Sequence, residues 1–183
     1  MKRQTLFLDT EFTGLHQQAR LISLALVDNH RSFYAEFNDF PEIDLTDWHQ
    51  EHVINNLLFK ELDTHGDIEG PHWQLKNTTA QVANQLRAFL QNFSKVKVWA
   101  DVLAYDWVLF CELFGGAMQL PESTFYIPGD MATLIQLKGY DPDTDRASLL
   151  DSEQQRRLEA RGLRKHNALY DAYLIQAIYH QLT

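Results

Sequence analysis

Short apolar runs separated by turns constrain the fold of this chain more than any other feature of the sequence. Residues 5–8 and Leu21–Val27 have the pattern of strands buried in a sheet, and Ser32–Phe37 predicts a third strand after a polar turn. Residues 96–99 and 125–127 predict a fourth and a fifth strand. The chain is therefore expected to build a mixed central sheet of about five strands.

Stretches with apolar residues at helical spacing lie between and after these strands. They predict helices at residues 47–59, 78–93, 104–114 and 167–181, with a further helix that begins at Asp130. Residues 63–71 contain two glycines and a proline and predict a loop. This order predicts one α/β domain over residues 1–183, with helices on the faces of the sheet and an acidic, partly helical insertion at about 38–76.

Composition excludes several classes of protein. The single cysteine, Cys111, cannot form an internal disulfide, which predicts a reducing, cytoplasmic environment. The apolar runs are far shorter than the roughly 20 residues of a membrane span, and the first residues do not resemble a secretory signal. A disordered, a secreted disulfide-rich and a membrane protein are therefore not expected.

The net charge of −9 would ordinarily argue against a nucleic-acid partner, but the charge is uneven. Residues 36–70 contain ten acidic residues and one lysine, so the rest of the chain is balanced. Residues 154–166 contain four arginines and Lys165 against the single acid Glu159. This basic run is either a solvated helix face or a set of phosphate contacts. The acidity of the chain thus does not exclude nucleic acid.

Two carboxylates follow the first predicted strand at a spacing of two. Side chains alternate along a strand, so Asp9 and Glu11 project to one face while Thr10 points to the other. Two like charges at the end of a buried strand are costly unless cations neutralise them, which favours a metal site. Asp67 and Glu69 have the same spacing, but they lie in a predicted loop and are interpreted as surface charges.

Three more chemically active residues lie at the starts of predicted helices. If Asn167 caps the last helix, His166 lies just outside it and Asp171 within it, so a loop imidazole can lie over a site that a helical carboxylate helps to build. Asp106 begins a helix directly after the fourth strand, and Asp101 at the exit of that strand competes with it. The alternatives are a packed or surface histidine and carboxylates that stabilise helix N-termini.

Three segments, taken in order, resemble the motifs of the DEDDh (DnaQ-like) 3′–5′ exonucleases. They are Phe7-Leu8-Asp9-Thr10-Glu11-Phe12-Thr13-Gly14-Leu15, Tyr105-Asp106-Trp107-Val108-Leu109-Phe110 and His166-Asn167-Ala168-Leu169-Tyr170-Asp171. The resemblance assigns the third acid of the family to Asp106 instead of Asp101. It is strongest toward small stand-alone bacterial exoribonucleases. Many members have His-Asn where this chain has Asp101-Val102.

The resemblance implies an RNase H-like fold and two divalent ions, Mg²⁺ or Mn²⁺. It implies Asp9 as the bridging ligand, Glu11 and Asp171 on the ion that activates water, Asp106 on the second ion, and His166 as the general base. The implied reaction releases nucleoside 5′-monophosphates from the 3′ end of single-stranded or overhanging RNA or DNA, with a lean toward RNA. A homodimer is also implied.

Four residues form the predicted substrate-binding set: Thr10, Phe12, Leu15 and Arg164. Phe12 either stacks on a terminal base, as aromatic residues do in single-strand binders, or is a core residue beside the strand end. His49 and His52 are close enough on a predicted helix to share a metal, but no third ligand is evident in the sequence.

Three alternative functions stay open at this stage. The first is a DNA-directed 3′–5′ exonuclease of the repair or proofreading type, because nothing in the sequence reports on recognition of the 2′-hydroxyl. The second is a non-catalytic interaction module that docks through its acidic segment at 36–70. The third is a metal-dependent phosphoesterase that acts on small nucleotides.

Overall fold

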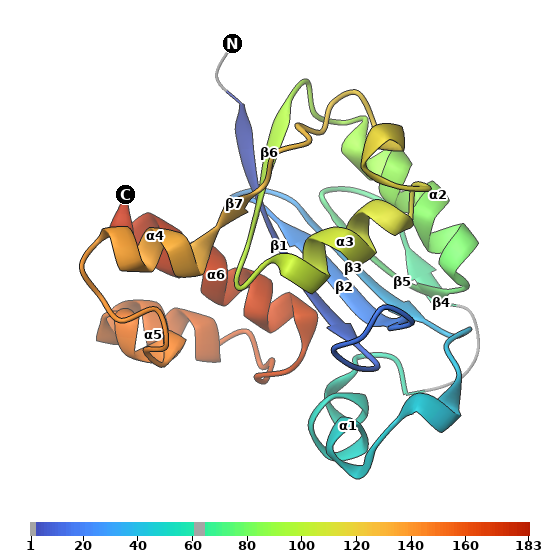
Figure 1. Cartoon of the computed structure of the whole chain (residues 1–183), viewed down its shortest axis with the longest axis horizontal. Helices are drawn as coiled ribbons and strands as arrows, with labels where there is room; N and C mark the ends of the chain where they lie inside the picture. Colours follow the sequence, from blue (N-terminus) through green and yellow to red (C-terminus); the bar gives the residue numbers. More distant parts are fainter. Residues whose placement is uncertain (1–2, 61–64) are drawn as a thin grey trace.

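A mixed β-sheet forms the centre of the computed structural model, which describes residues 3–60 and 65–183 (Figure 1). Within this part of the chain the sheet has seven strands in the order β4-β5-β3-β2-β1-β6-β7. The strands are β1 (Gln4–Phe12), β2 (Leu21–Val27), β3 (Ser32–Phe37), β4 (His65–Asp67), β5 (His72–Asn77), β6 (Val96–Ala100) and β7 (Gly129–Asp130). The predicted α/β class with an RNase H-like mixed sheet is confirmed, whereas the predicted number of strands was too low.

Strand β1 lies where the pairing of the strands changes from antiparallel to parallel. It pairs antiparallel with β2 and parallel with β6, while β2 pairs antiparallel with β3. Every residue of β2 is buried, which explains its nearly continuous apolar sequence. The central position of β1 brings its C-terminal end next to elements from both sides of the sheet.

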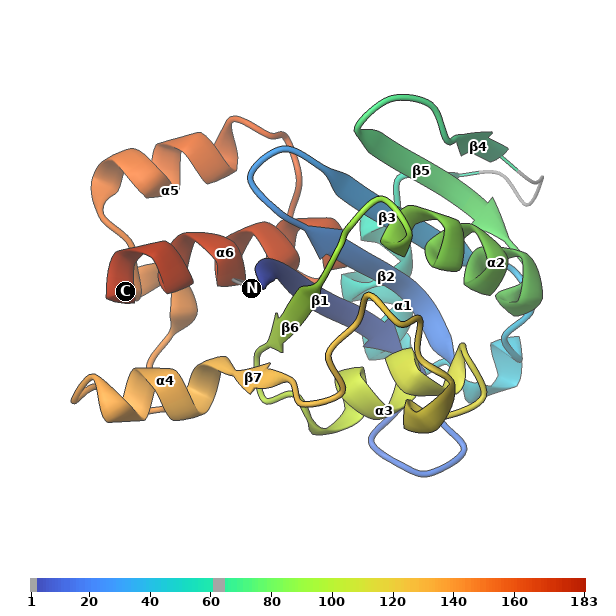
Figure 2. The same ribbon diagram turned by 90° about the horizontal axis from the view of Figure 1, so that it is seen from above.

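Helices cover both faces of the sheet (Figure 2). They are α1 (Asp47–His52), α2 (Thr79–Leu90), α3 (Ala104–Glu112), α4 (Met131–Leu137), α5 (Ser152–Glu159) and α6 (Ala168–Leu182). Leu6 and Leu8 of β1 share a core with α2 and α3, whereas Phe7 shares a second core with α4, α5 and α6. Within the described residues, none of the helices is both long and apolar enough for a membrane span.

The prediction of a strand at residues 125–127 is wrong. The chain instead makes an isolated bridge at Thr124 and pairs with the end of β6 at Gly129 and Asp130. Tyr126 and Ile127 are exposed, so their apolar character does not reflect sheet packing. Gly129 is needed in β7 because a Cβ atom there would lie 2.2 Å from the ring of Trp99.

The acidic segment is less helical than its sequence indicates. The helix predicted at 47–59 ends at His52 and is followed by a 3₁₀ turn at Ile54–Asn56. The loop predicted at 63–71 contains β4, and its residues 63 and 64 lie outside the described part of the chain. Strand β5 lies beside the edge strand, where a strand can be polar. It was missed because its sequence is largely polar and does not have the apolar pattern of a strand. Helix α1 lies beyond the end of the sheet where β1 finishes (Figure 1).

Candidate active site

The five residues singled out by the sequence motifs converge on one cavity of about 460 Å³. Its lining includes Asp9 and Glu11 from β1, Asp106 from α3, and His166 and Asp171 from the start of α6. These residues come from three segments that lie far apart in the sequence. The position of β1 between the two helical layers explains how α3 and α6 both reach its end.

The alternation of β1 sets the direction of the first two carboxylates. Asp9 and Glu11 follow Phe7 on the face toward α6, and both are partly buried, whereas Thr10 is buried on the opposite face. The pairing of β1 with β2 shifts register between Glu11 and Phe12. Such irregularities bend a strand and redirect side chains, and this one lies directly beside Glu11.

Asp106 is fixed to β1 by Thr10. The backbone N–H and the hydroxyl of Thr10 both donate to Oδ1 of Asp106, at 2.9 Å and 2.7 Å. The carboxylate is 8% exposed, so these two donors offset part of the cost of its burial. Thr10, which lies between Asp9 and Glu11 on β1, therefore links α3 on the opposite face of the sheet to the cavity.

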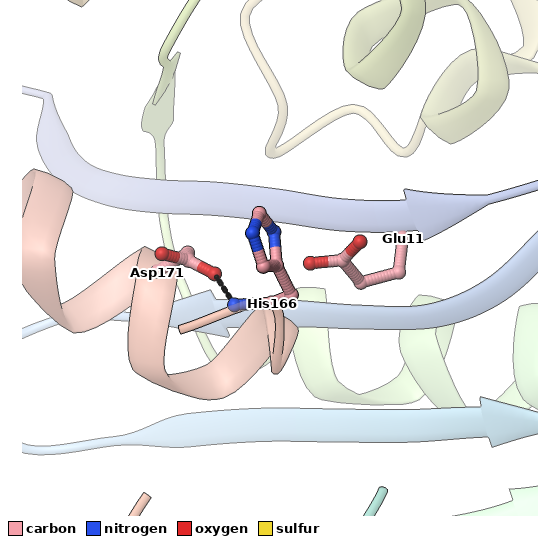
Figure 3. A group of neighbouring side chains, drawn as sticks. All are labelled: Glu11, His166 and Asp171. Carbon is pink, nitrogen blue, oxygen red and sulfur yellow. Dashed lines mark hydrogen bonds between the residues drawn. The ribbon is translucent and has the colours of Figure 1, made fainter. Parts of the chain in front are cut away.

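His166 lies between two carboxylates of the site (Figure 3). One ring nitrogen of His166 and one carboxylate oxygen each of Glu11 and Asp171 lie within 4.8 Å of one another. The backbone N–H of His166 also donates to Oδ2 of Asp171 at 2.8 Å. Asn167 caps α6 as predicted, and its side chain accepts from the N–H of Leu169.

Burial is the main reason why the carboxyl groups hold their protons more tightly than usual. It raises the pKa of Asp9 well above its ordinary value, with further contributions from the charges of Asp171, Asp106 and Glu11. It raises the pKa of Glu11 to about 8 and that of Asp171 to about 7. The pKa of Asp106 rises only to about 6, because the hydrogen bonds from Thr10 oppose the effect of burial.

The donor set fits hard divalent cations. Carboxylate oxygens are the preferred ligands of Mg²⁺ and Mn²⁺, and a cation would relieve the repulsion from Asp171 and Asp106 that contributes to the raised pKa values of Asp9 and Glu11. His166 differs from the acids, because burial and the nearby cation Lys165 lower its pKa. The imidazole is therefore neutral at pH 7 and able to accept a proton.

Asp101, the competing candidate, also lines the cavity but has a different partner. The guanidinium of Arg146 donates to both of its oxygens, from Nε at 2.5 Å and from Nη2 at 3.1 Å. Asp101 is thus neutralised by a cation of the protein, whereas the Asp106 carboxylate is held by Thr10. Val102, the next residue, has φ 46°, an uncommon conformation for a β-branched side chain.

The predicted substrate-binding residues separate into two groups. Phe12 and Thr10 line the cavity, and the ring of Phe12 stacks on Tyr105 with centroids 5.7 Å apart. The Thr10 hydroxyl, however, is directed to Asp106. Leu15 is 74% exposed and Arg164 is exposed, and neither belongs to the lining of this cavity.

Sequence reasoning missed several neighbours of the site. Arg146 lines the cavity and was not singled out, whereas Lys165, which also lines it, belongs to the basic run for which phosphate contacts were one of two interpretations. The ring of Trp48 contacts that of His166 edge to face at a centroid distance of 5.1 Å, and His52 lies 6.1 Å from it. No local pattern signals these contacts, because the partners belong to segments more than 100 residues apart.

Comparisons with known proteins identify the family to which this fold and site belong. Residues 4–183 match the model of a family described as the 3′-5′ exoribonuclease Rv2179c-like domain. Two curated relatives, each named as a 3′-5′ exoribonuclease, come from Mycobacterium tuberculosis strains CDC 1551/Oshkosh and ATCC 25618/H37Rv. Each is 28% identical to this chain over 136 residues, which cover 73% of this chain and 74% of the relative.

Proposed function

The chain belongs to the 3′-5′ exoribonuclease Rv2179c-like domain family, and from this membership we propose that it is a divalent-metal-dependent 3′–5′ exoribonuclease of the DEDDh type. The observation that carries the proposal is the convergence of Asp9, Glu11, Asp106 and Asp171 on one cavity that also contains the imidazole of His166. Neither membership nor geometry alone would specify the chemistry. Together they support hydrolysis of the terminal phosphodiester.

The four acids would hold two Mg²⁺ or Mn²⁺ ions. When bound, such ions supply positive charge that stabilises the attacking and leaving oxygens of a phosphodiester. Thr10 holds the Asp106 carboxylate in place through its two hydrogen bonds. The protein thereby presents a preformed set of oxygen ligands, so little reorganisation is needed when the substrate binds.

His166 would act as the general base. Its neutral imidazole takes a proton from the attacking water, whose oxygen forms a bond to phosphorus as the bond from phosphorus to the 3′ oxygen of the preceding nucleotide breaks. The products are a nucleoside 5′-monophosphate and a chain shortened by one nucleotide with a free 3′-hydroxyl. The hydrogen bond from the His166 N–H to Asp171 fixes the backbone beside this imidazole.

Phosphate needs cationic partners in an otherwise acidic cavity. Lys165 lines the cavity and is suited to this role, whereas the guanidinium of Arg146 is already engaged by Asp101 and by the backbone oxygen of Thr144. The stacked rings of Phe12 and Tyr105 offer an aromatic surface for an unpaired terminal base. A single-stranded or overhanging 3′ end is therefore the proposed substrate.

Length ladders test this function directly. End-labelled RNA and DNA of equal sequence are incubated with the protein in the presence of Mg²⁺, Mn²⁺ or EDTA. We expect stepwise shortening of RNA from the 3′ end, release of nucleoside 5′-monophosphates, and no shortening in EDTA. Shortening of DNA in preference to RNA would favour the repair or proofreading alternative, and shortening in EDTA would refute metal dependence.

A further inference from the structure

A buried chain of polar side chains connects the centre of the sheet to the residue that follows His166. Glu36 of β3 is fully buried, and its Oε1 accepts a hydrogen bond from the hydroxyl of Tyr34 at 2.8 Å. The same hydroxyl accepts from Nδ2 of Asn167 at 3.3 Å. Tyr34 and Asn167 are 0% exposed, so water does not compete for these bonds.

At the start of α6, the side-chain amide of Asn167 and its backbone oxygen all form hydrogen bonds. Its Oδ1 accepts from the N–H of Leu169 at 3.0 Å, and its Nδ2 also donates to the backbone oxygen of Asn56 at 2.8 Å. Its backbone oxygen accepts from the N–H of Asp171 at 3.1 Å. The position of Asn167 is therefore determined from several directions, and with it the positions of His166 before it and Asp171 after it.

The same network attaches the acidic insertion to the loop that carries His166. The side chain of Asn56 donates to the backbone oxygen of Lys165 at 3.0 Å. Oε1 of Glu36 accepts from the N–H groups of Leu58 and Phe59 at 2.6 Å and 3.0 Å. The segment between α1 and β4 thus holds the residue on each side of His166, through Lys165 and Asn167.

These hydrogen bonds lie beside a residue whose backbone conformation is unfavourable. His166 has φ 64°, in the left-handed region, where a non-glycine residue is held only by its surroundings. Glu36 also forms a buried ion pair with Lys76 at 3.6 Å, and apolar packing in place of such a pair is often at least as stabilising. A polar network at this place therefore suggests a requirement for orientation.

We propose that Tyr34, Asn56 and Asn167 are positioning residues for His166. They fix the left-handed backbone at residue 166 and thereby direct the imidazole toward Glu11 and Asp171. The acidic insertion is, on this basis, a structural support of the active site. The inference rests on the proposed function, since it assigns these residues to the general base of that reaction.

Tyr34→Phe is the first test, because it removes a single oxygen atom from a buried ring. Glu36 keeps its bonds from Leu58 and Phe59, and Asn167 keeps its bond to Asn56, so the variant should fold. We expect the single-turnover rate constant on RNA to fall roughly three- to tenfold, the change that corresponds to one hydrogen bond. Tyr179→Phe, farther along α6 with its ring against Phe7 and Trp99, is the matched control and should match the wild type.

A double-mutant cycle separates positioning from a general structural effect. Tyr34→Phe is also made in a His166→Ala protein, and single-turnover rates are measured with enzyme in excess. If Tyr34 acts through His166, the second substitution causes no further decrease. An equal decrease in both backgrounds, or a Tyr34→Phe enzyme as fast as the wild type, would overturn the inference.

A second variant tests the same inference from the other side of the loop. Asn56→Ala removes the bond to Lys165, and Asn55→Ala, at its exposed neighbour, serves as the control. In the metal-free protein, the NMR signal of the His166 ring should shift in Asn56→Ala and Tyr34→Phe but not in either control. A signal that stays in place in both test variants would contradict the inference.

The experiments also distinguish this inference from the proposed function. If His166→Ala is as active as the wild type, the proposed general base is wrong and the inference fails with it. If His166→Ala loses activity while Tyr34→Phe and Asn56→Ala do not, the proposed function stands and only the positioning role is refuted.

Discussion

His166 combines an unusual backbone conformation, a lowered pKa and a position beside two carboxylates of the site. Its φ of 64° turns the chain sharply just before α6, and its N–H donates to Asp171. Burial and Lys165 lower the pKa of its imidazole, which keeps the ring neutral near pH 7. A neutral imidazole beside the carboxylates of Glu11 and Asp171 has the properties required of the proposed base.

Replacement of His166 by alanine should therefore affect turnover and metal binding differently. We expect His166→Ala to lower the rate by roughly 10²- to 10⁴-fold, the usual contribution of general base catalysis. Stabilisation by Mn²⁺ in thermal unfolding should be retained, because the four carboxylates remain. Wild-type turnover would exclude the base role, and loss of the Mn²⁺ effect would indicate that His166 is a ligand instead.

Phe12 has two possible roles that a pair of variants can separate. Its ring stacks on Tyr105 and lines the cavity, so a base-stacking role predicts that both Phe12→Ala and Phe12→Leu lose the preference for unpaired 3′ ends. A core role predicts that leucine restores the wild-type behaviour. The measurement compares the rates on RNA with a single-stranded 3′ overhang and on blunt duplex RNA.

At the scale of elements, the site depends on attachments between layers that pack on opposite faces of the sheet. Helix α6 covers one face of β1 and α3 the other, so the carboxylates of Asp171 and Asp106 approach the end of the strand from two sides. Thr10 makes the attachment on the side of α3. Its role in the structure is thus to hold Asp106.

Thr10→Val tests this attachment without a large change in volume. Loss of the hydroxyl removes a bond that lowers the pKa of Asp106, so this pKa should rise above its value of about 6. Asp106 is then protonated up to a higher pH, so less of the enzyme has the charged carboxylate at pH 6. The ratio of activity at pH 6 to that at pH 8 should therefore fall below that of the wild type. Thr5→Val, near the other end of β1, is the control, and an unchanged ratio in Thr10→Val would contradict the attachment.

At the scale of the whole molecule, the concentration of acids in one cavity makes stability depend on pH. The pKa values of Asp106, Asp171 and Glu11 rise to about 6, 7 and 8 in the folded protein, whereas carboxyl groups in unfolded chains titrate near pH 4. The folded state thus binds protons more tightly than the unfolded state. The resulting stabilisation is present below about pH 4 and is lost as the pH rises through 6 to 8.

In EDTA, the melting temperature of the wild type should therefore decrease between pH 5 and pH 8. Asp9→Asn removes one of the repelling charges, so it should melt at a higher temperature than the wild type at pH 8 in EDTA. Mn²⁺ should stabilise the wild type at pH 8 but not Asp9→Asn, which should also lack nuclease activity. Asp67→Asn, at an exposed carboxylate at the end of β4, is the control and should behave as the wild type.

Local patterns in the sequence determined the elements that carry the candidate site. The apolar run of β1 followed by Asp9 and Glu11, the first turn of α3 with Asp106, and the cap at Asn167 all depend on neighbours within a few residues. Strand alternation and helix capping are local effects, so they can be read without knowledge of the fold. The short or polar strands β4, β5 and β7 could not be predicted in this way, because they form only by pairing with strands distant in sequence or with each other: β5 pairs with β3, β4 with β5, and β7 with β6.

The tertiary structure alone decided what surrounds the motif residues. The bond between Asn167 and Tyr34 joins residues 133 apart, that between Asn56 and Lys165 joins residues 109 apart, and that between Arg146 and Asp101 joins residues 45 apart. Such contacts depend on how the layers pack, and a polar side chain gives no local sign of its distant partner. The sequence therefore specified which groups gather at the candidate site, and long-range contacts decided how the backbone on each side of His166 is bonded.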